Sequence, residues 1–514
     1  MNVQSTRVLV AGGGLVGLTT ALVLRHHGVE VTLVEKRATT SPQPKARRFH
    51  RRTMEVFREL GIAGLVHEAA RDLAEHHHMA AGRTLAEAEQ LPLWLPSAPD
   101  GTYLEPGPEL PCLVAQDVLE PVLRSAAAEA GADVRFSTEL TGFTSGPDGV
   151  VAELHDRASG RHEQLHVPFL VAADGAHSPV RTALGIGRSG RGAIGGPAVN
   201  VYFRADLAEV VHGREFNLCQ IEHPDAPGAL ASIDGRSRWV FMAGGGTERD
   251  WAALLRTALG VPAPDLEVLS VLAWQPEMLV ADRFSAGRVH LAGDAAHVMP
   301  PFAATGANTG IADAHNLGWK LAAVLTGAAA PDLLDSYDAE RRPAGWFAAD
   351  QSSRRSADLR SAATADEALA HPFVLAAGGF QYPSGALVGG PDEGGEIEPV
   401  DVFAPAGRVG TRVPHEWLDE AHTRSTLDLA GPGWALVVND DPAGWEHGAA
   451  SAPLPLPVHR LAAGFLPEGC ALLLRPDQVV GWRGTDPTAP ADVLRRLLTG
   501  AAKCLRTSAA AVRT

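Results

Sequence analysis

Three glycines near the start of the chain have the spacing that brings a protein backbone close to a pyrophosphate. The stretch RVLVAGGGLVGLTTALVLRHHGVEVTLVEK, residues 7–36, places Gly12, Gly14 and Gly17 between an apolar run and a segment with helical spacing of leucines. Gly12 allows a tight turn, Gly14 lets a phosphate approach, and Gly17 lets the helix pack closely on the strand. The helix N-terminus adds free N–H groups and positive potential. The pattern predicts a βαβ unit that binds a dinucleotide.

An acidic residue completes this pattern. Glu35 ends a second β-rich run, residues 29–34, where a carboxylate can accept hydrogen bonds from an adenosine ribose. A ribose without a 2′-phosphate fits such a site, which favours FAD or NAD. The alternative is a glycine-rich turn without a ligand, and the strand, helix, strand and acid context disfavours it.

Composition and charge exclude several functional classes. The 514 residues suffice for two to four domains, and 45% of them are apolar and 20% charged, as in soluble globular proteins. The net charge of −16 argues against nucleic acid or an anionic membrane as a partner. No run reaches the roughly 18 apolar residues of a membrane span, and the N-terminus lacks a signal-peptide pattern. We therefore expect a cytoplasmic location.

The four cysteines are Cys112, Cys219, Cys470 and Cys504. They are dispersed, without a C-x-x-C pair, which predicts free thiols rather than disulfides or a metal centre. We expect no metal ion.

The remaining chain does not continue as a regular array of βα repeats. Residues 187–281 show short alternating runs with turn signals, which predict an antiparallel sheet. A glycine- and proline-rich stretch near residues 389–407 reads as a linker before a compact tail. The other expected elements are helices from about residue 53, from 116 and over 308–325 and 493–498, and strands over 150–154, 165–172, 289–292, 434–438 and 471–474.

Three separated motifs together resemble a known family. They are GGGLVG with Glu35, DGAHSPVR at residues 174–181, and LAGDAAHVMPP at residues 291–301. The set resembles the single-component FAD-dependent aromatic hydroxylases of the para-hydroxybenzoate hydroxylase type, over roughly residues 7–345. The tail, with GTRVPHEWL, STLDL and ALLLRPDQVVGW, resembles the thioredoxin-like domain of the branch that contains phenol hydroxylase and the tailoring hydroxylases of aromatic polyketides.

The resemblance implies an α/β fold, α+β overall, in three domains. Residues 1–78, 106–186 and 281–375 would form a discontinuous Rossmann-type FAD-binding domain. Residues 79–105 and 187–280 would form an antiparallel-sheet substrate domain, and residues 396–514 a thioredoxin-like C-terminal domain.

The family pattern also implies which residues contact FAD. In it, Asp294 hydrogen-bonds the ribityl chain, Gln116 reaches the flavin side of the cofactor, and the start of a helix at Asn308 faces the N1 and O2 edge of the flavin. For Asp174 and Arg181 the alternative is a structural ion pair. The implied cofactor-binding residues are Gly12, Gly14, Leu15, Val16, Gly17, Glu35, Lys36, Lys45, Arg47, Gln116, Asp174, Gly175, Asp294, Pro301, Gly306, Ala307 and Asn308.

The chain departs from the family pattern in two places. Lys45 stands where the family usually has an arginine, and Arg47 and Arg48 follow it, so which of the three meets the FAD phosphates is left open. Ala303 and Ala304 stand in a loop that is usually glycine-rich, and their methyl groups would restrict the backbone beside the flavin.

A substrate cavity is expected between the sheet domain and the flavin. No residue is assigned as catalytic, and for each wall candidate ordinary core packing is an equal alternative. The candidate wall residues are Trp94, Phe203, Phe216, Trp239, Phe241, Phe302 and Tyr382.

The resemblance implies a monooxygenase. FAD would be reduced by NAD(P)H, react with O₂ to a C4a-hydroperoxide, and hydroxylate a polycyclic aromatic, polyketide-like substrate. The chain has no second complete dinucleotide fingerprint, so NAD(P)H is expected as a transient co-substrate. Alternatives are a Baeyer–Villiger oxygenation of a ketone, a flavin-binding protein without turnover, and an NAD-dependent dehydrogenase. The choice of NADPH or NADH and the formation of a homo-oligomer are left open.

Overall fold

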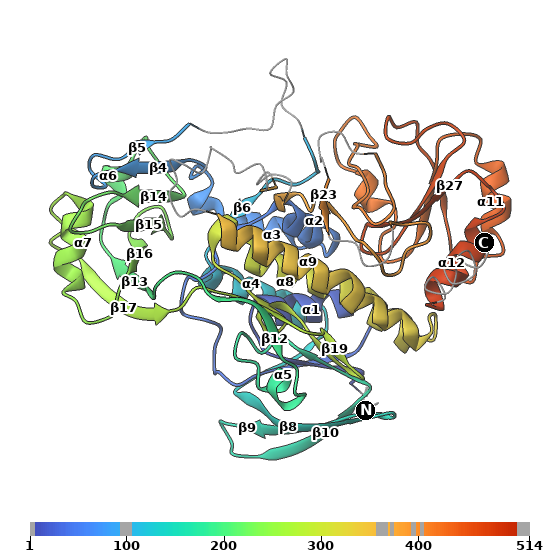
Figure 1. The fold of residues 1–514 in the computed structure, drawn as a ribbon, viewed down its shortest axis with the longest axis horizontal. Helices are drawn as coiled ribbons and strands as arrows, with labels where there is room; N and C mark the ends of the chain where they lie inside the picture. The colour runs from blue at the N-terminus through green and yellow to red at the C-terminus, as the bar shows by residue number, and fades with distance from the viewer. Residues whose placement is uncertain are drawn as a thin grey trace, which may run out of the picture.

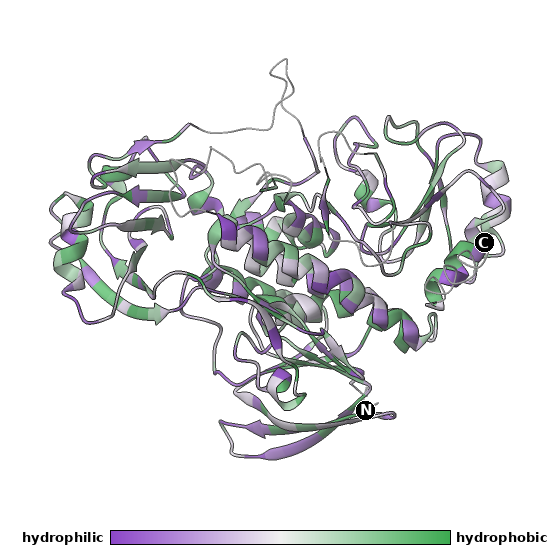
Figure 2. Ribbon diagram, viewed as in Figure 1, coloured by the Kyte–Doolittle hydropathy of each residue, from purple (hydrophilic) through white to green (hydrophobic). Residues whose placement is uncertain are grey.

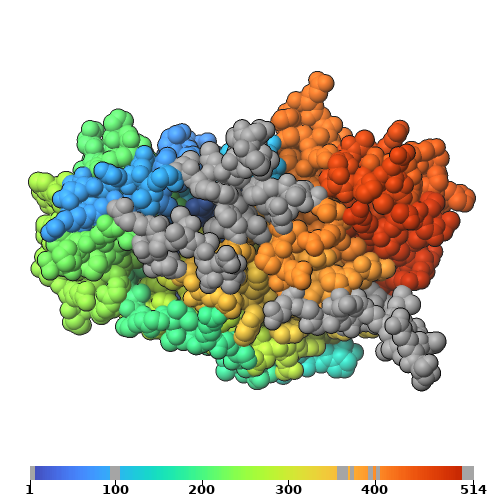
Figure 3. Space-filling view, turned by 45° about the horizontal axis from the view of Figure 1, so that its top comes forward, coloured from blue at the N-terminus to red at the C-terminus, as the bar shows by residue number. Residues whose placement is uncertain are grey.

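The computed structural model describes residues 6–92, 105–355, 369–370, 375–391, 397–400 and 406–500. A central domain carries a sheet domain at one end and a C-terminal domain at the other (Figure 1). The space-filling view shows these two outer parts at opposite ends of the molecule (Figure 3). Within the described ranges no helix is both long and apolar enough to cross a membrane.

The central domain is built on a six-stranded sheet with the order β19-β20-β11-β1-β2-β7. All its pairings are parallel except that of β19 with β20. Strands β1, β2 and β11 are buried along their whole length, as expected for strands covered on both faces. The strands are β1 (Val8–Ala11), β2 (Val31–Glu35), β7 (Asp133–Phe136), β11 (Phe169–Ala172), β19 (Ser285–Ala286) and β20 (Val289–Leu291).

Helix α8 lies between α1 and α9, and most of its residues are buried. Two of its glycines permit close contact with α1, because a Cβ at Gly310 would overlap Val16 and one at Gly318 would overlap Val23. Many hydrophilic residues line α9 (Figure 2) although it is packed in the molecule. The helices are α1 (Leu15–His26), α2 (Arg51–Glu59), α3 (Ala63–Ala69), α4 (Gln116–Glu129), α5 (Pro179–Ala183), α8 (Thr305–Leu325) and α9 (Asp335–Arg354).

Three small sheets and four 3-10 turns complete the central domain. The sheets comprise β8 (Thr138–Gly146), β9 (Gly149–Asp156) and β10 (His162–Val167); β12 (Arg188–Ala193), β18 (Glu277–Ala281) and β21 (His297–Val298); and β3 (Arg48–Phe49) with β6 (Cys112–Leu113). The turns are η1 (Arg71–Leu73), η2 (Gly293–Ala295), η3 (Phe302–Ala304) and η4 (Pro331–Leu334).

The sheet domain is a seven-stranded sheet with the order β17-β13-β16-β15-β14-β4-β5. Its strands pair antiparallel, as expected, except that β14 and β4 run parallel. Strands β12 and β18, at the ends of the expected sheet region, pair with each other instead and lie outside this sheet. The elements are β4 (Met79–Gly82), β5 (Glu89–Gln90), β13 (Ala198–Arg204), α6 (Ala208–Val211), β14 (Leu218–Ile221), β15 (Gly228–Ser232), β16 (Arg238–Gly244), α7 (Trp251–Leu259) and β17 (Glu267–Trp274).

The C-terminal domain is a four-stranded sheet with the order β25-β24-β26-β27. A parallel β24-α11-β25 unit is followed by two antiparallel strands and a helix, which confirms the predicted thioredoxin-like domain. Its elements are β24 (Ala435–Val438), α11 (Ala443–Ala449), β25 (Val458–Arg460), β26 (Ala471–Leu474), β27 (Val480–Gly484) and α12 (Pro490–Leu498); β22 (Phe380–Gln381), β23 (Glu398–Pro399) and η5 (Thr426–Asp428) precede them.

Candidate functional site

The glycine turn after β1 has the shape that a pyrophosphate requires. Gly12 has a φ of +114°, and a Cβ there would overlap the carbonyl of Ala173. A Cβ at Gly17 would overlap the carbonyl of Gly12. At Gly14, by contrast, the nearest atom to an added Cβ is Glu120 Oε1 at 3.6 Å, so this glycine borders open space at the N-terminus of α1. The turn fits a dinucleotide.

Glu35 is held against this turn at the end of β2. Its carboxylate accepts hydrogen bonds from the Gly13 N–H at 2.8 Å and the Arg37 N–H at 2.9 Å. Gly13 allows this approach, since a Cβ there would lie 2.7 Å from the Cβ of Glu35. The acid therefore lies beside the glycine turn, at the end of β2, from which the sequence predicts contact with an adenosine ribose. Its neighbour Lys36 is exposed.

The second and third sequence motifs are joined by Arg181. Its Nη1 donates to the carbonyl of Ala295 at 2.9 Å, and its Nη2 donates to the carbonyls of Ala176 and His177. Asp174 instead accepts from the Val180 N–H at 3.1 Å, and the alternative of a structural ion pair between Asp174 and Arg181 is not found among the described residues. Arg181 thus fixes the loop that carries Asp294.

Asp294 lies on η2 with an exposed side chain, and the preceding Gly293 packs on Val16 next to the glycine turn. The surrounding protein raises the pKa of Asp294 by desolvation, while interactions with His297 and Lys45 act in the opposite direction. Lys45 also acts on Glu120, so its charge is near both carboxylates.

Arg47, one of the three basic candidates for the FAD phosphates, contacts the sheet domain. Its guanidinium donates to the carbonyl of Ser232 and to the carbonyl and Oδ1 of Asn217, each at 2.7 Å. Burial lowers the pKa of Arg47 to about 10. Arg47 therefore ties the central domain to the sheet domain, whereas the charge of Lys45 acts on Asp294 and Glu120.

Gln116 reaches the Lys45 loop from the first turn of α4. Its Oε1 accepts from the Ala46 N–H at 3.1 Å, and its Nε2 donates to Glu120 at 2.6 Å. Glu120 also accepts from the Ser41 N–H at 2.7 Å. Sequence analysis did not identify Glu120, although a glutamate one turn after Gln116 shares its helix face.

Both the oxygen and the nitrogen of the Asn308 side-chain amide form hydrogen bonds, which connect three elements. Its Oδ1 accepts from the His50 N–H at 2.8 Å and from Thr53 Oγ1 at 2.6 Å. Its Nδ2 donates to the carbonyls of Arg48 at 3.0 Å and Ala304 at 2.6 Å. Strand β3, helix α2 and the start of α8 are thereby held together.

The loop before α8 has an unfavourable backbone. Ala303 and Ala304 have φ values of 60° and 53°, in the left-handed region that L residues avoid. This is the restriction expected from methyl groups in a loop that is usually glycine-rich. Pro301 in this loop is exposed, and Gly306 and Ala307 in the first turn of α8 are half-buried.

Replacing Ala304 with glycine should raise the free energy of unfolding by roughly 0.5–1 kcal/mol. Relief of a left-handed L residue is worth about 1–2 kcal/mol, and the greater freedom of glycine in the unfolded chain offsets about 0.4–1 kcal/mol of it. Urea unfolding measures the change. The same substitution at Ala253, in the regular helix α7, should cost about 1 kcal/mol. A lower free energy of unfolding in both variants would contradict the left-handed backbone strain at Ala304.

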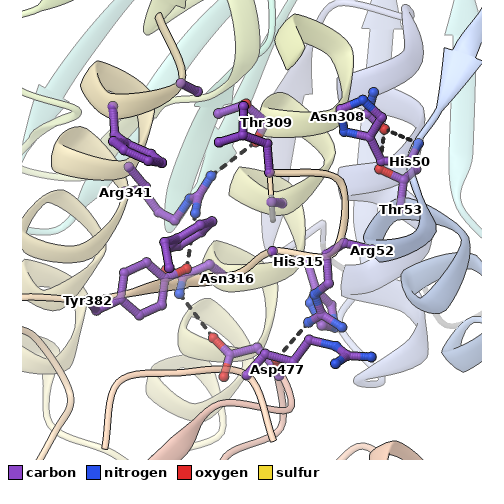
Figure 4. Close-up of a pocket in the computed structure, with 18 of the residues that line it drawn as sticks. His50, Arg52, Thr53, Asn308, Thr309, His315, Asn316, Arg341, Tyr382 and Asp477 are labelled. Carbon is purple, nitrogen blue, oxygen red and sulfur yellow. Dashed lines mark hydrogen bonds between the residues drawn. The ribbon is translucent and has the colours of Figure 1, made fainter. Parts of the chain in front are cut away.

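A cavity of about 90 Å³ lies between α2, α8, α9 and the C-terminal domain (Figure 4). Its charged side chains are paired with protein groups: Arg52 with Gln478, and Arg341 with Asp313. Burial lowers the pKa of His50, which faces the cavity, to about 3. No residue of the glycine turn lines the cavity, but Thr305 and Asn308, at the start of α8, do.

The two faces of the seven-stranded sheet have different partners. Phe203, Phe216, Trp239 and Phe241 are at most 2% exposed and pack in the core that α7 covers. The expectation that they line the substrate cavity is therefore not met, and core packing accounts for them. The opposite face carries Tyr202, Leu218, Val240 and Met242, and it contacts Ala115 and Val118 of the central domain.

The other wall candidates lie elsewhere. Tyr382 is 6% exposed, and its hydroxyl accepts from Arg341 Nη1 at 3.0 Å on the C-terminal-domain side of α8. Phe302 is half-buried in η3, and Trp94 lies outside the described residues.

Three further predicted cofactor-binding residues are placed as follows. Leu15 is buried in the core, Val16 packs beside Gly293, and no atom lies within 4 Å of an added Cβ at Gly175.

Asp313 is a further buried group that sequence analysis missed. Its Oδ2 accepts from the Gly293 N–H at 3.1 Å and from His297 Nε2 at 2.7 Å, and its Oδ1 accepts from Arg341 Nε at 2.8 Å. The signal was a charged residue four positions before Leu317, on the same face of an otherwise apolar helix segment. Asp313 holds the residue before Asp294 against α8.

Family comparisons agree with this geometry. Residues 5–352 match the model described as FAD binding domain, and residues 406–501 match the model described as aromatic-ring hydroxylase, C-terminal. A tetracenomycin B2 monooxygenase-dioxygenase of Streptomyces olivaceus is 38% identical, over 96% of this chain and 98% of the relative. An aklavinone 12-hydroxylase of Streptomyces purpurascens is 34% identical, over 97% of this chain and 100% of the relative.

Solved structures give the same result. Aklavinone-11 hydroxylase in complex with FAD and aklavinone has a TM-score of 0.83 and 31% identity, over 97% of this chain and 100% of that chain. The flavin-dependent monooxygenase PieE in complex with FAD and substrate has a TM-score of 0.82 and 28% identity, with the same coverage. The glycine turn, the Asp294 loop and the C-terminal domain are thus accounted for together: the chain belongs to the family of FAD-binding aromatic-ring hydroxylases and is a FAD-dependent monooxygenase.

Proposed function

We propose that this monooxygenase uses NAD(P)H and O₂ to hydroxylate a polycyclic aromatic substrate of the polyketide type. The observation that carries the proposal is the position of the 43–47 loop. This loop is linked to the glycine turn by hydrogen bonds from Ala46 through Gln116 and Glu120, and it contacts the sheet domain through Gln43 and Arg47. It therefore joins the proposed dinucleotide site to the face of the sheet that α7 leaves uncovered.

The residues around the glycine turn and the Asp294 loop take roles that follow from their positions. Gly14 and the N-terminus of α1 would hold the FAD pyrophosphate with Lys45, and Glu35 the adenosine ribose. Asp294 would accept from the ribityl hydroxyls. The first N–H groups of α8, at Gly306 and beyond, would stabilise negative charge at the flavin edge. When bound, FAD supplies the transfer of reducing equivalents from NAD(P)H and of one oxygen atom from O₂.

The uncovered sheet face is the proposed wall for the substrate. Tyr202 and Met242 lie on it, and Leu272 on the neighbouring strand is 39% exposed. Trp274 Nε1 donates to Asn200 Oδ1 at 2.9 Å, which fixes an aromatic ring at its edge. Planar polycyclic rings suit such a surface, and relatives are named for tetracenomycin B2 and aklavinone.

The test is NAD(P)H consumption by the FAD-loaded protein with a panel of polycyclic phenols and quinones. NADPH and NADH are compared, and products are analysed after turnover under ¹⁸O₂. A labelled hydroxyl on an intact carbon skeleton supports the proposal. A labelled ester or lactone would show Baeyer–Villiger oxygenation and overturn hydroxylation, and tightly bound FAD without NAD(P)H oxidation would overturn both.

Replacing Asp294 with alanine should weaken FAD binding by roughly 10- to 100-fold. A hydrogen bond to a charged group contributes about 1.5–3 kcal/mol, and about 1.4 kcal/mol corresponds to a tenfold change. Titration of the apoprotein with FAD, followed by flavin fluorescence, measures the dissociation constant. Asp294→Asn keeps an acceptor and should give an intermediate value. Binding of Asp294→Ala as tight as that of the parent would show that this loop does not hold the cofactor.

A further inference from the structure

Arg48 has no partner for its guanidinium in a region where neighbouring arginines are paired. The described residues give it neither a side-chain hydrogen bond nor an ion pair. Arg47 and Arg52, in contrast, donate to Asn217 and Gln478 respectively. Arg48 is half-buried, and burial lowers its pKa. A partly desolvated cation with free donors is unfavourable unless an anion joins it.

The strand geometry shows where this side chain points. Arg48 and Phe49 form β3, and Phe49 is fully buried in the core of the central domain, so Arg48 points to the opposite side. His50 is also extended, with φ −73° and ψ 161°, and shares the side of Arg48. The His50 Nε2 lies 2.9 Å from the carbonyl of Ala303.

Two further observations place Arg48 beside the loop before α8. Its positive charge contributes, after burial, to the low pKa of His50, so the two side chains lie near each other. Its carbonyl accepts from Asn308, which also holds the carbonyl of Ala304. Arg48 is therefore fixed beside the start of α8, whereas the charge of Lys45 acts on Asp294 and Glu120.

We propose that Arg48 binds an ionised oxygen, phenolate or carboxylate, of the aromatic substrate; this rests on the proposed function. A guanidinium offers five N–H donors in a planar fork that suits an oxyanion. Beside this charge a phenol loses its proton to solvent at a lower pH, because a nearby cation favours the ionised form. The resulting phenolate has the electron-rich ring that an aromatic hydroxylase attacks. Arg48 thus selects anionic over neutral ring systems.

Three probes with one ring system test the proposal on the FAD-loaded protein. They are 2-hydroxyanthraquinone, 2-methoxyanthraquinone and anthraquinone-2-carboxylate. Dissociation constants come from equilibrium titration, and the visible absorption of the hydroxy probe reports its ionisation. In the parent, the bound hydroxy probe should ionise at a lower pH than the free probe. The parent should also bind an anionic probe more tightly than the methoxy probe. Preference for the hydroxy probe identifies a phenolate site, and preference for the carboxylate probe a carboxylate site.

Arg48→Gln should weaken binding of the preferred anionic probe at least tenfold and change binding of the methoxy probe less than threefold. Arg48→Lys should restore part of the loss because it keeps the charge. Arg83→Gln removes an exposed arginine after β4 and should change neither constant. FAD content, read from flavin absorbance, should stay that of the parent in all variants.

Two results would overturn the inference. One is a parent that binds the methoxy probe as tightly as both anionic probes. The other is an Arg48→Gln variant with equal losses, or none, for charged and neutral probes. Hydroxylation by that variant with an unchanged KM would leave the proposed function intact. Conversely, charge-selective binding without any substrate-stimulated NAD(P)H oxidation would overturn the proposed function alone.

Discussion

Asp313→Asn should lower the free energy of unfolding by about 3–5 kcal/mol and weaken FAD binding at the same time. Removing one member of a buried ion pair leaves an uncompensated charge of this cost. Arg341 would keep its charge at 1% side-chain exposure. Arg341 and His297 bind different oxygens of Asp313, so in the new amide one of these two donors would face an NH₂ group, which is itself a donor. The Gly293 N–H would lose its charged acceptor, and the Asp294 loop its fixed position.

Urea unfolding of the holoenzyme and FAD titration of the apoprotein measure the two effects. Asp492→Asn is the matched control, because Asp492 is 54% exposed and pairs with Arg496 on the surface of α12. Its effect should be below about 1 kcal/mol, as for other exposed pairs. A stability loss in Asp313→Asn without weaker FAD binding would mean that Asp313 braces the fold but does not position the cofactor loop.

Glu340→Gln should be the most destabilising substitution at the junction of the central and C-terminal domains. Glu340, on α9, accepts from Lys320 of α8 at 2.8 Å and from both Nη atoms of Arg475 at 2.8 Å. The side chains of Glu340, Lys320 and Arg475 are all fully buried. Asp477 would be left as the one acid beside two cations in this cluster. The expected loss is about 3–5 kcal/mol.

The same cluster predicts a pH dependence. The favourable charges of Arg475 and Lys320 outweigh desolvation and lower the pKa of Glu340 from 4.5 to about 2. A carboxylate with a lowered pKa in the folded state contributes stability above its unfolded pKa and loses it as the pH falls through the folded value. The parent should therefore lose this contribution between about pH 4.5 and pH 2. The Gln variant should have a flatter stability curve there.

Glu267→Gln is the control for this substitution. Glu267 is 59% exposed and pairs with Arg204 at 2.8 Å on the sheet domain, so its loss should cost less than about 1 kcal/mol. Separate unfolding transitions for the two domains in Glu340→Gln, in place of one, would show that the cluster joins them. A variant as stable as the parent, with the same pH dependence, would contradict a stabilising role.

Much of the fold could be predicted because its motifs are local. The turn from Gly12 to Gly17 and the acid at Glu35 lie within one βαβ unit, so sequence spacing alone determines their geometry. The family and the thioredoxin-like tail were likewise confirmed. Lys45, Arg47 and Arg48 could not be separated, since adjacent residues in an extended segment point in different directions and the directions depend on distant partners such as Asn217.

The substrate wall shows the same limit. Period-two spacing indicates that Trp239 and Phe241 share one face of a strand, but it does not show which face meets the central domain. Large aromatic residues suggested a ligand wall, and the structure uses them as the core under α7. Tyr382 was named as a wall candidate, but its contact with Arg341 was not predicted: the two residues are distant in sequence, and no local pattern pairs them.

Substitutions on the two faces of the seven-stranded sheet should have different consequences in protein engineering. Consecutive residues such as Tyr202 and Phe203 differ by one position yet contact different parts of the molecule. A library randomised at Tyr202, Leu272 and Met242 should therefore change which ring systems are accepted while most members still fold. A library of equal size at Phe203, Trp239 and Phe241 should yield mainly unfolded protein. If this face binds the substrate as proposed, new specificity can be selected within the sheet without rebuilding the scaffold.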